Sequence, residues 1–496
     1  MGYNTLMLYT EDTYEVNNQP YFGHLRGRYT KDELKELDAF CNSIGIELVP
    51  CIQTLAHLNG MFRWQKEYDD INDCDDILLA EEEKTYKLIE DMISTLSECF
   101  TTRKIHIGMD EAYKIGTGKY QQKHGIKDRF DIINNHLHKV CSITRKYNFE
   151  PMVWSDMFCK LALGTQNQYE KVDFSIIKEK ANLPEDISLV YWDYYHTEYD
   201  HYVNMIKTNK AFNRKVYFAG GAWTWPGFAP RNGYSIKTTD AAVKACNDCG
   251  VDGMFFTMWG DDGDECSKFA VLPSLMFAAE ATRGNTDIES IKKKFKDITG
   301  CDFDSFMLLD QFNMLNGKDE QGQSKLRLYN DIFLGTKDYL CTEEDSAFYA
   351  SLAEKIKNAS GKGEFSYMFD VYEKYAKVLE IKSALGIRTR KAYLGKDTRA
   401  LKEIICDYDT LSDRLEEFYA SYKSEWFREN KPHGFDVQDI RLGGLMRRVQ
   451  SCKERLANFI DGKINEIPEL SEPVLEGVGY EHWGRLISAN VITCSL

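Results

Sequence analysis

The feature that most constrains the fold is a regular alternation, over residues 1–285, between short apolar runs and segments with helical periodicity. Helices are expected over 30–45, where Thr30 and Glu33 match a capping box and Gly45 can end the helix. Further helices are expected over 81–100, 130–147, 197–210 and 239–248, and from about 266. The apolar runs are YNTLMLYT from 3, IELVPCIQ from 46, KIHIGM from 104, PMVW from 151, SLVYW from 188, KVYFAGG from 215 and GMFFTMW from 253. Buried strands that alternate with helices predict a parallel sheet of βα units.

The residues that follow the strands favour a closed barrel over an open sheet. Polar or aromatic clusters follow almost every run: TED, QTLAH, DE, WSD, WDYY, GAWTW and WGDDGDE. An open sheet gathers its site at one switch point, whereas a barrel collects side chains from every strand end. The prediction is a (β/α)8 TIM barrel. Because only seven runs are found, we expect it to lack its first strand and helix. A refilling of that gap by the C-terminal YEHWGRLISANVITCSL is the disfavoured alternative.

A second domain is expected because a chain of 496 residues exceeds what one core usually supports. From residue 286 the strand signal fades and helical spacing takes over. TEEDSAFYASLAEKIKNASG starts with a capping box at Thr342 and closes at Gly361, and YDTLSDRLEEFYASYKSEWF continues the pattern. We therefore predict a barrel over 1–285, N-terminally incomplete, and a mostly α-helical domain over 286–496.

Composition narrows the class of partner. A net charge of -16 without a long basic run argues against nucleic acid and anionic membranes. No run approaches the ~18 apolar residues of a membrane helix. The 14 cysteines are scattered, and Cys246 and Cys249 in ACNDCG have no second pair or nearby His to complete a metal site. We expect a cytoplasmic protein with reduced thiols and with neither a cofactor nor a bound metal.

The pair Asp110 and Glu111 in KIHIGMDEAYKIG follows the third strand. With 78 acidic residues in the chain, adjacent acids arise by chance, and a solvated helix N-terminus is the simplest explanation. At the catalytic face of a barrel, however, a carboxyl group with apolar walls and a second carboxylate beside it should have a raised pKa and can serve as a general acid. The pair is therefore the first candidate for chemistry.

The tryptophans supply a second signal. Five of the eight follow the last four strands: Trp154, Trp192, Trp223, Trp225 and Trp259. Any one of them alone is best explained as an ordinary core residue. Five at one face are different, because flat apolar rings with a polar edge suit the C–H face of a sugar and the methyl of an acetamido group.

The motif HIGMDE, residues 106–111, resembles the signature of glycoside hydrolase family 20, the β-N-acetylhexosaminidases. LYTEDTYEV followed by RYT, VPCIQTLAH, WSDM, WDYY and MWGDD also resemble family segments. The C-terminal half is similar to the subgroup whose barrel is followed by a helical domain. The resemblance implies a family 20-like catalytic barrel and exo-acting, substrate-assisted, retaining hydrolysis of terminal β-linked GlcNAc or GalNAc. The implied partner is an amino-sugar glycoside or oligosaccharide.

The resemblance also implies roles for the acids. Glu111 would be the acid/base that protonates the glycosidic oxygen and later deprotonates water. Asp110 would hold the acetamido N–H so that the substrate's own carbonyl oxygen attacks the anomeric carbon. His57, with Glu11 or Asp12 behind it, resembles a pair that orients the catalytic acid, although a structural histidine is an equal explanation.

Other roles follow from the same resemblance. Tyr194 is favoured to bind the acetamido oxygen, with Tyr191 and Tyr195 left open, and His106 is expected to be structural. Four tryptophans would form a box around the methyl group and the sugar ring: Trp154, Trp223, Trp225 and Trp259. Trp192 is a further substrate-binding candidate. The loop acids are candidates for the outer hydroxyls, with a solvated loop as an equal explanation: Asp261, Asp262 and Glu265.

Two competing functions remain. The family's first strand supplies an Arg that grips sugar hydroxyls, and no counterpart precedes Tyr3. The chain could therefore be an amino-sugar-binding pseudoenzyme. A metal-dependent hydrolase is disfavoured because no HxH pair occurs on a strand; HLH at 136–138 lies in a predicted helix. Its ligands would be His57, His106, His196 and Asp110. GlcNAc or GalNAc preference, the linkage and a homodimer through the helical domain are left open.

Overall fold

The computed structural model describes residues 1–165, 167–169, 182–317, 319–359 and 363–474. The chain folds into two compact units. The first unit comprises Met1–Gly221, Ile236–Thr257 and Ala278–Thr286, and the second comprises Ala222–Ser235, Met258–Phe277 and Asp287–Leu496. Each unit is described separately below.

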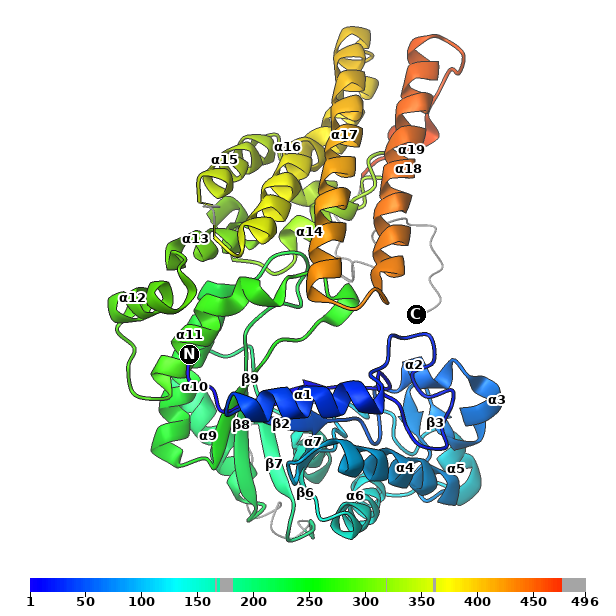
Figure 1. Ribbon diagram of the computed structural model, residues 1–496. Coiled ribbons are helices and arrows are strands. Elements are labelled where there is room, and N and C mark those ends of the chain that lie inside the picture. Colours follow the sequence, from blue (N-terminus) through cyan, green and yellow to red (C-terminus); the bar gives the residue numbers. More distant parts are fainter. Residues whose placement is uncertain (166, 170–181, 318, 360–362, 475–496) are drawn as a thin grey trace. The chain divides into compact units, whose positions relative to one another are not determined.

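A seven-stranded parallel sheet forms the centre of the first unit (Figure 1). Its order is β1 (Thr5–Tyr9), β2 (Glu47–Cys51), β5 (Lys104–His106), β6 (Glu150–Trp154), β7 (Ser188–Trp192), β8 (Lys215–Gly221) and β9 (Gly253–Thr257). All seven strands predicted from the sequence are thereby confirmed. Within the described residues β1 and β9 are the two edges of the sheet. The pairs Cys51–His106 and His106–Met152 are in register, so the ends of β2 and β5 lie side by side.

Helices connect these strands in the predicted alternation. The capping box at Thr30 and Glu33 is present at the start of α1 (Lys31–Ser43). A short hairpin of β3 (Asn72–Cys74) and β4 (Ile77–Leu78) was not predicted. The remaining helices are α2 (Asn59–Phe62), α3 (Gln65–Tyr68), α4 (Glu83–Cys99), α5 (Lys119–His124), α6 (Arg129–Lys146), α7 (Asp156–Leu163), α9 (Tyr199–Lys210), α10 (Asn232–Cys249) and α11 (Leu272–Ala281). α10 begins seven residues earlier than predicted.

The core of the first unit lies between strands and helices. Ile105 and Val153 on the strands are fully buried, and they belong to one apolar cluster with Leu34 of α1, Ile89 of α4 and Ile133 of α6. Apolar side chains at helical spacing therefore cover the sheet and leave its carboxyl-terminal edge to polar residues.

The second unit is helical, as predicted. Its helices are α12 (Ile288–Thr299), α13 (Phe303–Met307), α14 (Gln323–Tyr329), α15 (Glu344–Ala359), α16 (Ser366–Leu394), α17 (Thr398–Glu429), α18 (Phe435–Ile460) and α19 (Pro468–Ser471). Its core contains an aromatic stack in which Tyr375 packs on Phe418, and Phe418 on Tyr422. α15 is the helix expected after Thr342, whereas Gly361 and YEHWGRLISANVITCSL lie outside the described residues. No helix in the described ranges combines the length and apolar character needed to cross a bilayer.

Candidate active site

An unusual backbone presents the two acids after β5. Gly108, Met109 and Glu111 all have positive φ, at 73°, 72° and 53°. A Cβ at Gly108 would lie 2.1 Å from Gln53 Oε1 and 2.7 Å from the Ile52 carbonyl oxygen. The glycine of HIGMDE is therefore required twice, by its left-handed conformation and by the close approach of β2.

Two side chains from the segment after β2 hold Asp110. His57 Nε2 lies 3.2 Å from Asp110 Oδ2, and Gln53 Nε2 donates to Asp110 Oδ1 at 2.8 Å. Gln53 is fully buried, and its Oε1 accepts the Met109 N–H at 3.3 Å. Gln53 was not predicted as a site residue, although it belongs to the QTLAH cluster noted after the second strand.

Glu111 has a different set of partners. Its Oε1 accepts from the Tyr113 hydroxyl at 3.0 Å, and its Oε2 lies 3.8 Å from His57 Nε2. Its backbone N–H donates to Asp156 Oδ2 at 3.1 Å. Neither Tyr113 nor Asp156 was predicted as a site residue.

The pKa values in this cluster diverge. Burial alone would lower the pKa of His57, but the hydrogen bond and charge of Asp110 raise it to about 10. Burial opposes ionisation of Asp110, yet His57 and Gln53 hold its pKa below the usual range. The raised pKa expected for the pair is thus not found at Asp110. It is found at Asp156, where burial and the charge of Asp110 raise the pKa to about 7.

The acids expected behind His57 are engaged elsewhere. Arg26 Nε donates to Asp12 Oδ1 at 2.6 Å, and Arg26 Nη2 lies 3.4 Å from Glu11 Oε2. The carboxylate nearest to His57 Nδ1 is that of Asp76, at 4.0 Å, and Asp76 Oδ2 also accepts the backbone N–H of His57 at 3.0 Å. Asp76 is thus a further carboxylate beside His57, and the expected Glu11 also interacts with the charge of His57.

His106 and Trp154 are buried residues at the ends of β5 and β6 that pack against each other. His106 is fully buried, its Nδ1 accepts the Gly108 N–H at 3.1 Å, and burial lowers its pKa to about 3. Its ring lies 4.3 Å from that of Trp154, which is 1% exposed and also faces Phe255 of β9. The structural role expected for His106 agrees with these contacts.

The tyrosines after β7 are distinguished by their surroundings. Tyr191 belongs to an apolar cluster with Tyr202 of α9, and its hydroxyl donates to Asp193 Oδ2 at 2.8 Å. Tyr194 stacks on Trp192, with ring centroids 5.2 Å apart. Tyr195 is 46% exposed, and its backbone N–H donates to Asp193 Oδ1 at 3.0 Å. Of these three tyrosines, Tyr194 is the one that stacks on Trp192, which favours it over Tyr191 and Tyr195 as the candidate for the acetamido oxygen.

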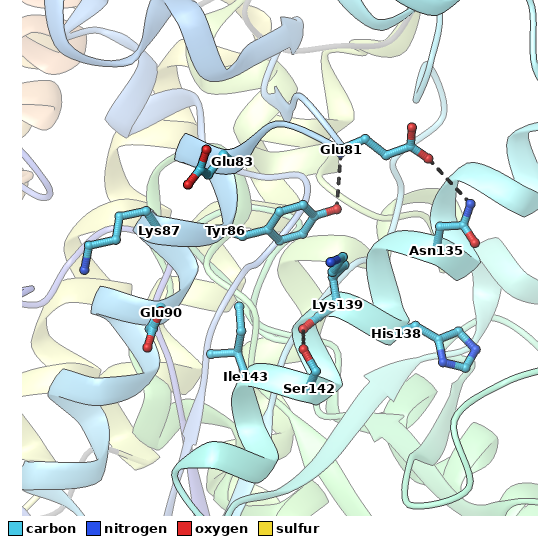
Figure 2. Close-up of a pocket in the computed structure, with 10 residues that line it drawn as sticks. All are labelled: Glu81, Glu83, Tyr86, Lys87, Glu90, Asn135, His138, Lys139, Ser142 and Ile143. Carbon is cyan, nitrogen blue, oxygen red and sulfur yellow. Dashed lines mark hydrogen bonds between the residues drawn. The ribbon is translucent and has the colours of Figure 1, made fainter.

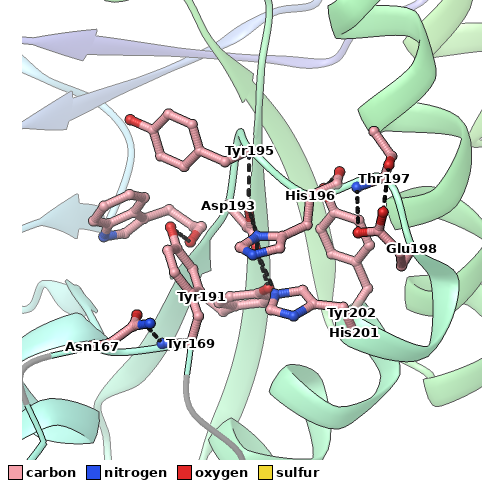
Figure 3. A network of polar contacts seen from close by, with 11 residues as sticks. Asn167, Tyr169, Tyr191, Asp193, Tyr195, His196, Thr197, Glu198, His201 and Tyr202 are labelled. Atoms are coloured by element: carbon pink, nitrogen blue, oxygen red, sulfur yellow. Dashed lines mark hydrogen bonds and ion pairs between the residues drawn. The ribbon is translucent and has the colours of Figure 1, made fainter.

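Asp193 joins two histidines in a network shown in Figure 3. His196 Nδ1 and His201 Nε2 each lie 2.9 Å from Asp193 Oδ2, a grouping of metal-ligand type that was not predicted. The two imidazole planes are only 12° apart with centroids separated by 3.6 Å. A metal about 2 Å from both nitrogens would lie far out of the ring planes, so the geometry is that of hydrogen bonds. They lower the pKa of Asp193 to about 2 against the effect of burial. His196 thus belongs here and not with His57 and Asp110.

The remaining predicted residues belong to the second unit. Trp223 and Trp225 stack at 4.5 Å, and Thr224 Oγ1 donates to the Trp259 carbonyl oxygen at 2.6 Å. Asp261 and Asp262 are exposed. Glu265 is 5% exposed and is paired with Lys325 at 2.7 Å and Arg441 at 3.2 Å. These pairs give Glu265 a structural explanation, and the sugar contact stays a prediction.

A groove of about 910 Å³ lies between α4 and α6 (Figure 2). Its lining includes Tyr86, Glu90, Asn135 and Ser142. None of the predicted site residues lines it, so the acid pair, and not this groove, remains the candidate for chemistry.

Comparison with known proteins gives two family matches. Residues 7–252 match the catalytic domain of glycosyl hydrolase family 20, and residues 304–484 match the glycoside hydrolase 20C C-terminal domain. Hexosaminidase D of Bos taurus is 24% identical over 209 residues, which cover 39% of this chain and 55% of that protein. Hexosaminidase D of Homo sapiens is also 24% identical over 209 residues, with 39% of each chain covered. The chain thus spans about half, or less, of the curated relatives it matches.

Among solved structures, an exo β-N-acetylglucosaminidase of this family from Vibrio harveyi, in complex with N-acetylglucosamine, is 14% identical. The match covers 62% of this chain and 53% of that one, with a TM-score of 0.43. The two family models, which together match most of the chain, show that it belongs to glycoside hydrolase family 20.

Proposed function

We propose that the chain is an exo-acting β-N-acetylhexosaminidase that removes terminal β-linked GlcNAc or GalNAc. The observation that carries the proposal is the division of contacts at the acid pair. Asp110 is held by His57 and Gln53, whereas Glu111 points to Tyr113. Two adjacent carboxyl groups that share His57 but differ in their other partners can act on two different parts of one substrate.

Asp110 is suited to orient the substrate. Its lowered pKa keeps it ionised at neutral pH, and His57 and Gln53 fix its two oxygens. An ionised carboxylate in a fixed position can accept the acetamido N–H and so align the acetamido carbonyl oxygen with the anomeric carbon. The substrate would then supply its own nucleophile, and no second catalytic carboxylate would be needed.

Glu111 is suited to transfer the proton. Its carboxyl group is partly exposed, with 39% of the side chain accessible, and can reach a glycosidic oxygen. It would protonate the leaving group as the carbonyl oxygen attacks, and it would take a proton from water as the cyclic intermediate opens. Trp192 and Tyr194 are proposed to contact the sugar and its acetamido group. The roles of Trp154, Trp223, Trp225, Trp259, Asp261 and Asp262 stay predictions from the resemblance.

A substrate panel tests the proposal. We expect hydrolysis of 4-nitrophenyl β-GlcNAc or β-GalNAc, no comparable hydrolysis of the β-glucoside, and inhibition by a GlcNAc-thiazoline that is tighter than by GlcNAc. Efficient cleavage of the β-glucoside would contradict substrate assistance. Calorimetric binding of GlcNAc without any hydrolysis would instead support the amino-sugar-binding pseudoenzyme.

A further inference from the structure

Asp156 is a buried residue that binds the backbone of Glu111. It is the first residue of α7, immediately after β6, and only 3% of it is exposed. Its Oδ2 accepts the Glu111 N–H at 3.1 Å, although 45 residues separate the two in sequence. WSDM was noticed for its tryptophan, and Asp156 had no predicted role.

This hydrogen bond acts on a strained residue. The φ of Glu111 is 53°, a left-handed conformation that a glutamate rarely adopts. A buried carboxylate that binds the Glu111 N–H fixes the peptide plane between Asp110 and Glu111, and with it the position of the Glu111 Cα. The conformation in turn fixes the direction in which the Glu111 side chain leaves the chain.

The charged groups around Asp156 are Asp110 and Glu111 after β5, and Lys160 one turn along α7. Lys160 Nζ lies over the Tyr113 ring at 4.1 Å, and burial lowers the pKa of Lys160. Asp156 Oδ1 has no hydrogen-bond partner among the described residues. A cavity of about 10 Å³ adjoins Asp156, with Gln168 and Asn209 in its lining. Burial and the charge of Asp110 together raise the pKa of Asp156 to about 7.

We propose that Asp156 is a positioning residue for Glu111: its carboxyl group holds the Glu111 amide and thereby aims the acid/base at the glycosidic oxygen. The inference rests on the proposed function, in which Glu111 transfers the proton. Asp156 itself touches no reacting atom. Its effect on rate passes through the backbone of Glu111 and through its charge beside the acid pair.

Two substitutions separate the hydrogen bond from the charge. Asp156→Asn keeps an amide oxygen that can accept the Glu111 N–H. We expect it to retain kcat within about tenfold, while the alkaline limb of the pH profile moves to lower pH, because loss of a neighbouring negative charge makes deprotonation of the pair easier. Asp156→Ala loses the acceptor. We expect a fall in kcat/KM of about 100-fold, concentrated in kcat and larger for poor leaving groups than for nitrophenyl glycosides.

Asp38 offers a matched control outside the site. It is also 3% exposed, and its Oδ2 accepts a backbone N–H, that of Thr101, at 3.2 Å. Asp38→Ala should destabilise the protein but leave the pH profile and the dependence on leaving group unchanged. Equal effects of Asp38→Ala and Asp156→Ala on these two measurements would reduce Asp156 to a structural residue and overturn the inference.

A stability measurement tests the environment of Asp156 without any turnover. The folded-state pKa of Asp156 lies above the value of an unfolded aspartate. The contribution of this carboxyl group to folding stability therefore falls as pH rises from the unfolded to the folded pKa. The melting temperature of Asp156→Asn relative to the wild type should therefore rise from pH 4 to pH 7. A constant difference would contradict a buried Asp156 coupled to the pair, even in a protein without activity. A wild type that does not hydrolyse β-GlcNAc or β-GalNAc would instead remove the proposed function.

Discussion

At the scale of single residues, the candidate site places similar carboxyl groups in different surroundings. Asp110, Glu111 and Asp156 are three carboxylic acids within one cluster, yet their supports differ. Asp110 has a cationic partner, and Asp156 has a backbone amide and a neighbouring negative charge. Environment, more than residue type, therefore sets the different pKa values of Asp110 and Asp156.

The ion pair between His57 and Asp110 predicts a pH-dependent stability. The folded-state pKa of His57 is about 10, above its usual 6.5, so its stabilisation is complete below pH 6.5 and is lost as pH rises through 10. The difference in unfolding free energy between wild type and His57→Asn should fall between pH 7 and pH 10, by at most about 1.4 kcal/mol per pH unit. Denaturant unfolding at several pH values measures this. A difference that does not change with pH would show that His57 is neutral.

The acid pair could be located from sequence, but most of its supports could not. HIGMDE marks Asp110 and Glu111 because the motif is local. Gln53, Asp76 and Asp156 reach the pair only through tertiary contacts. Their sequence signal is a polar residue at or after a strand end, which many surface loops share. Asp76, the further carboxylate beside His57, was missed for the same reason.

At the scale of elements, apolar runs predicted the sheet well. All seven strands were found because each reads as a continuous apolar segment, including the edge strands β1 and β9, whose residues are only partly buried. The hairpin of β3 and β4 was missed because NDC has no β propensity. α7 was missed because it begins within WSDM, only two residues after β6 ends. The sequence analysis interpreted WSDM as the polar cluster that follows a strand.

The turn after β5 predicts a sharp contrast between two glycines. Gly108→Ala would place a methyl 2.1 Å from Gln53 Oε1, whereas Gly45 has a similar φ of 77° with nothing within 4 Å of an added Cβ. Gly45→Ala should cost about 1 kcal/mol from backbone strain alone. Gly108→Ala should cost more, and it should also lower kcat because Gln53 can no longer hold Asp110. Equal stability and equal activity of the two variants would contradict the role given to Gln53.

At the scale of the whole molecule, the two family models place a catalytic-domain match before a helical-domain match. The predicted division at residue 285 stays a prediction, since the models leave residues 253–303 unassigned and the compact units exchange segments there. Within the second unit, Glu265 connects the segment Met258–Phe277 to Lys325 of α14 and Arg441 of α18. Buried charges of this kind hold distant segments in one arrangement.

The buried position of Glu265 predicts a structural phenotype. Glu265→Gln would remove the buried carboxylate that pairs with Lys325 and Arg441, so the second unit should lose about 3 kcal/mol of stability. Glu343→Gln, which breaks an exposed pair with Lys391, is the control and should change stability little. Thermal unfolding compares them. Normal stability of Glu265→Gln together with weaker substrate binding would restore the sugar contact predicted from the sequence.

The most direct test of the central claim is the dependence of Glu111→Ala on the leaving group. If Glu111 gives its proton to the glycosidic oxygen, a nitrophenolate can depart without that proton, whereas an alcohol leaving group cannot. The loss in kcat/KM should therefore be at least about 100-fold larger for chitobiose than for 4-nitrophenyl β-GlcNAc. Equal losses on the two substrates would show that Glu111 is not the acid.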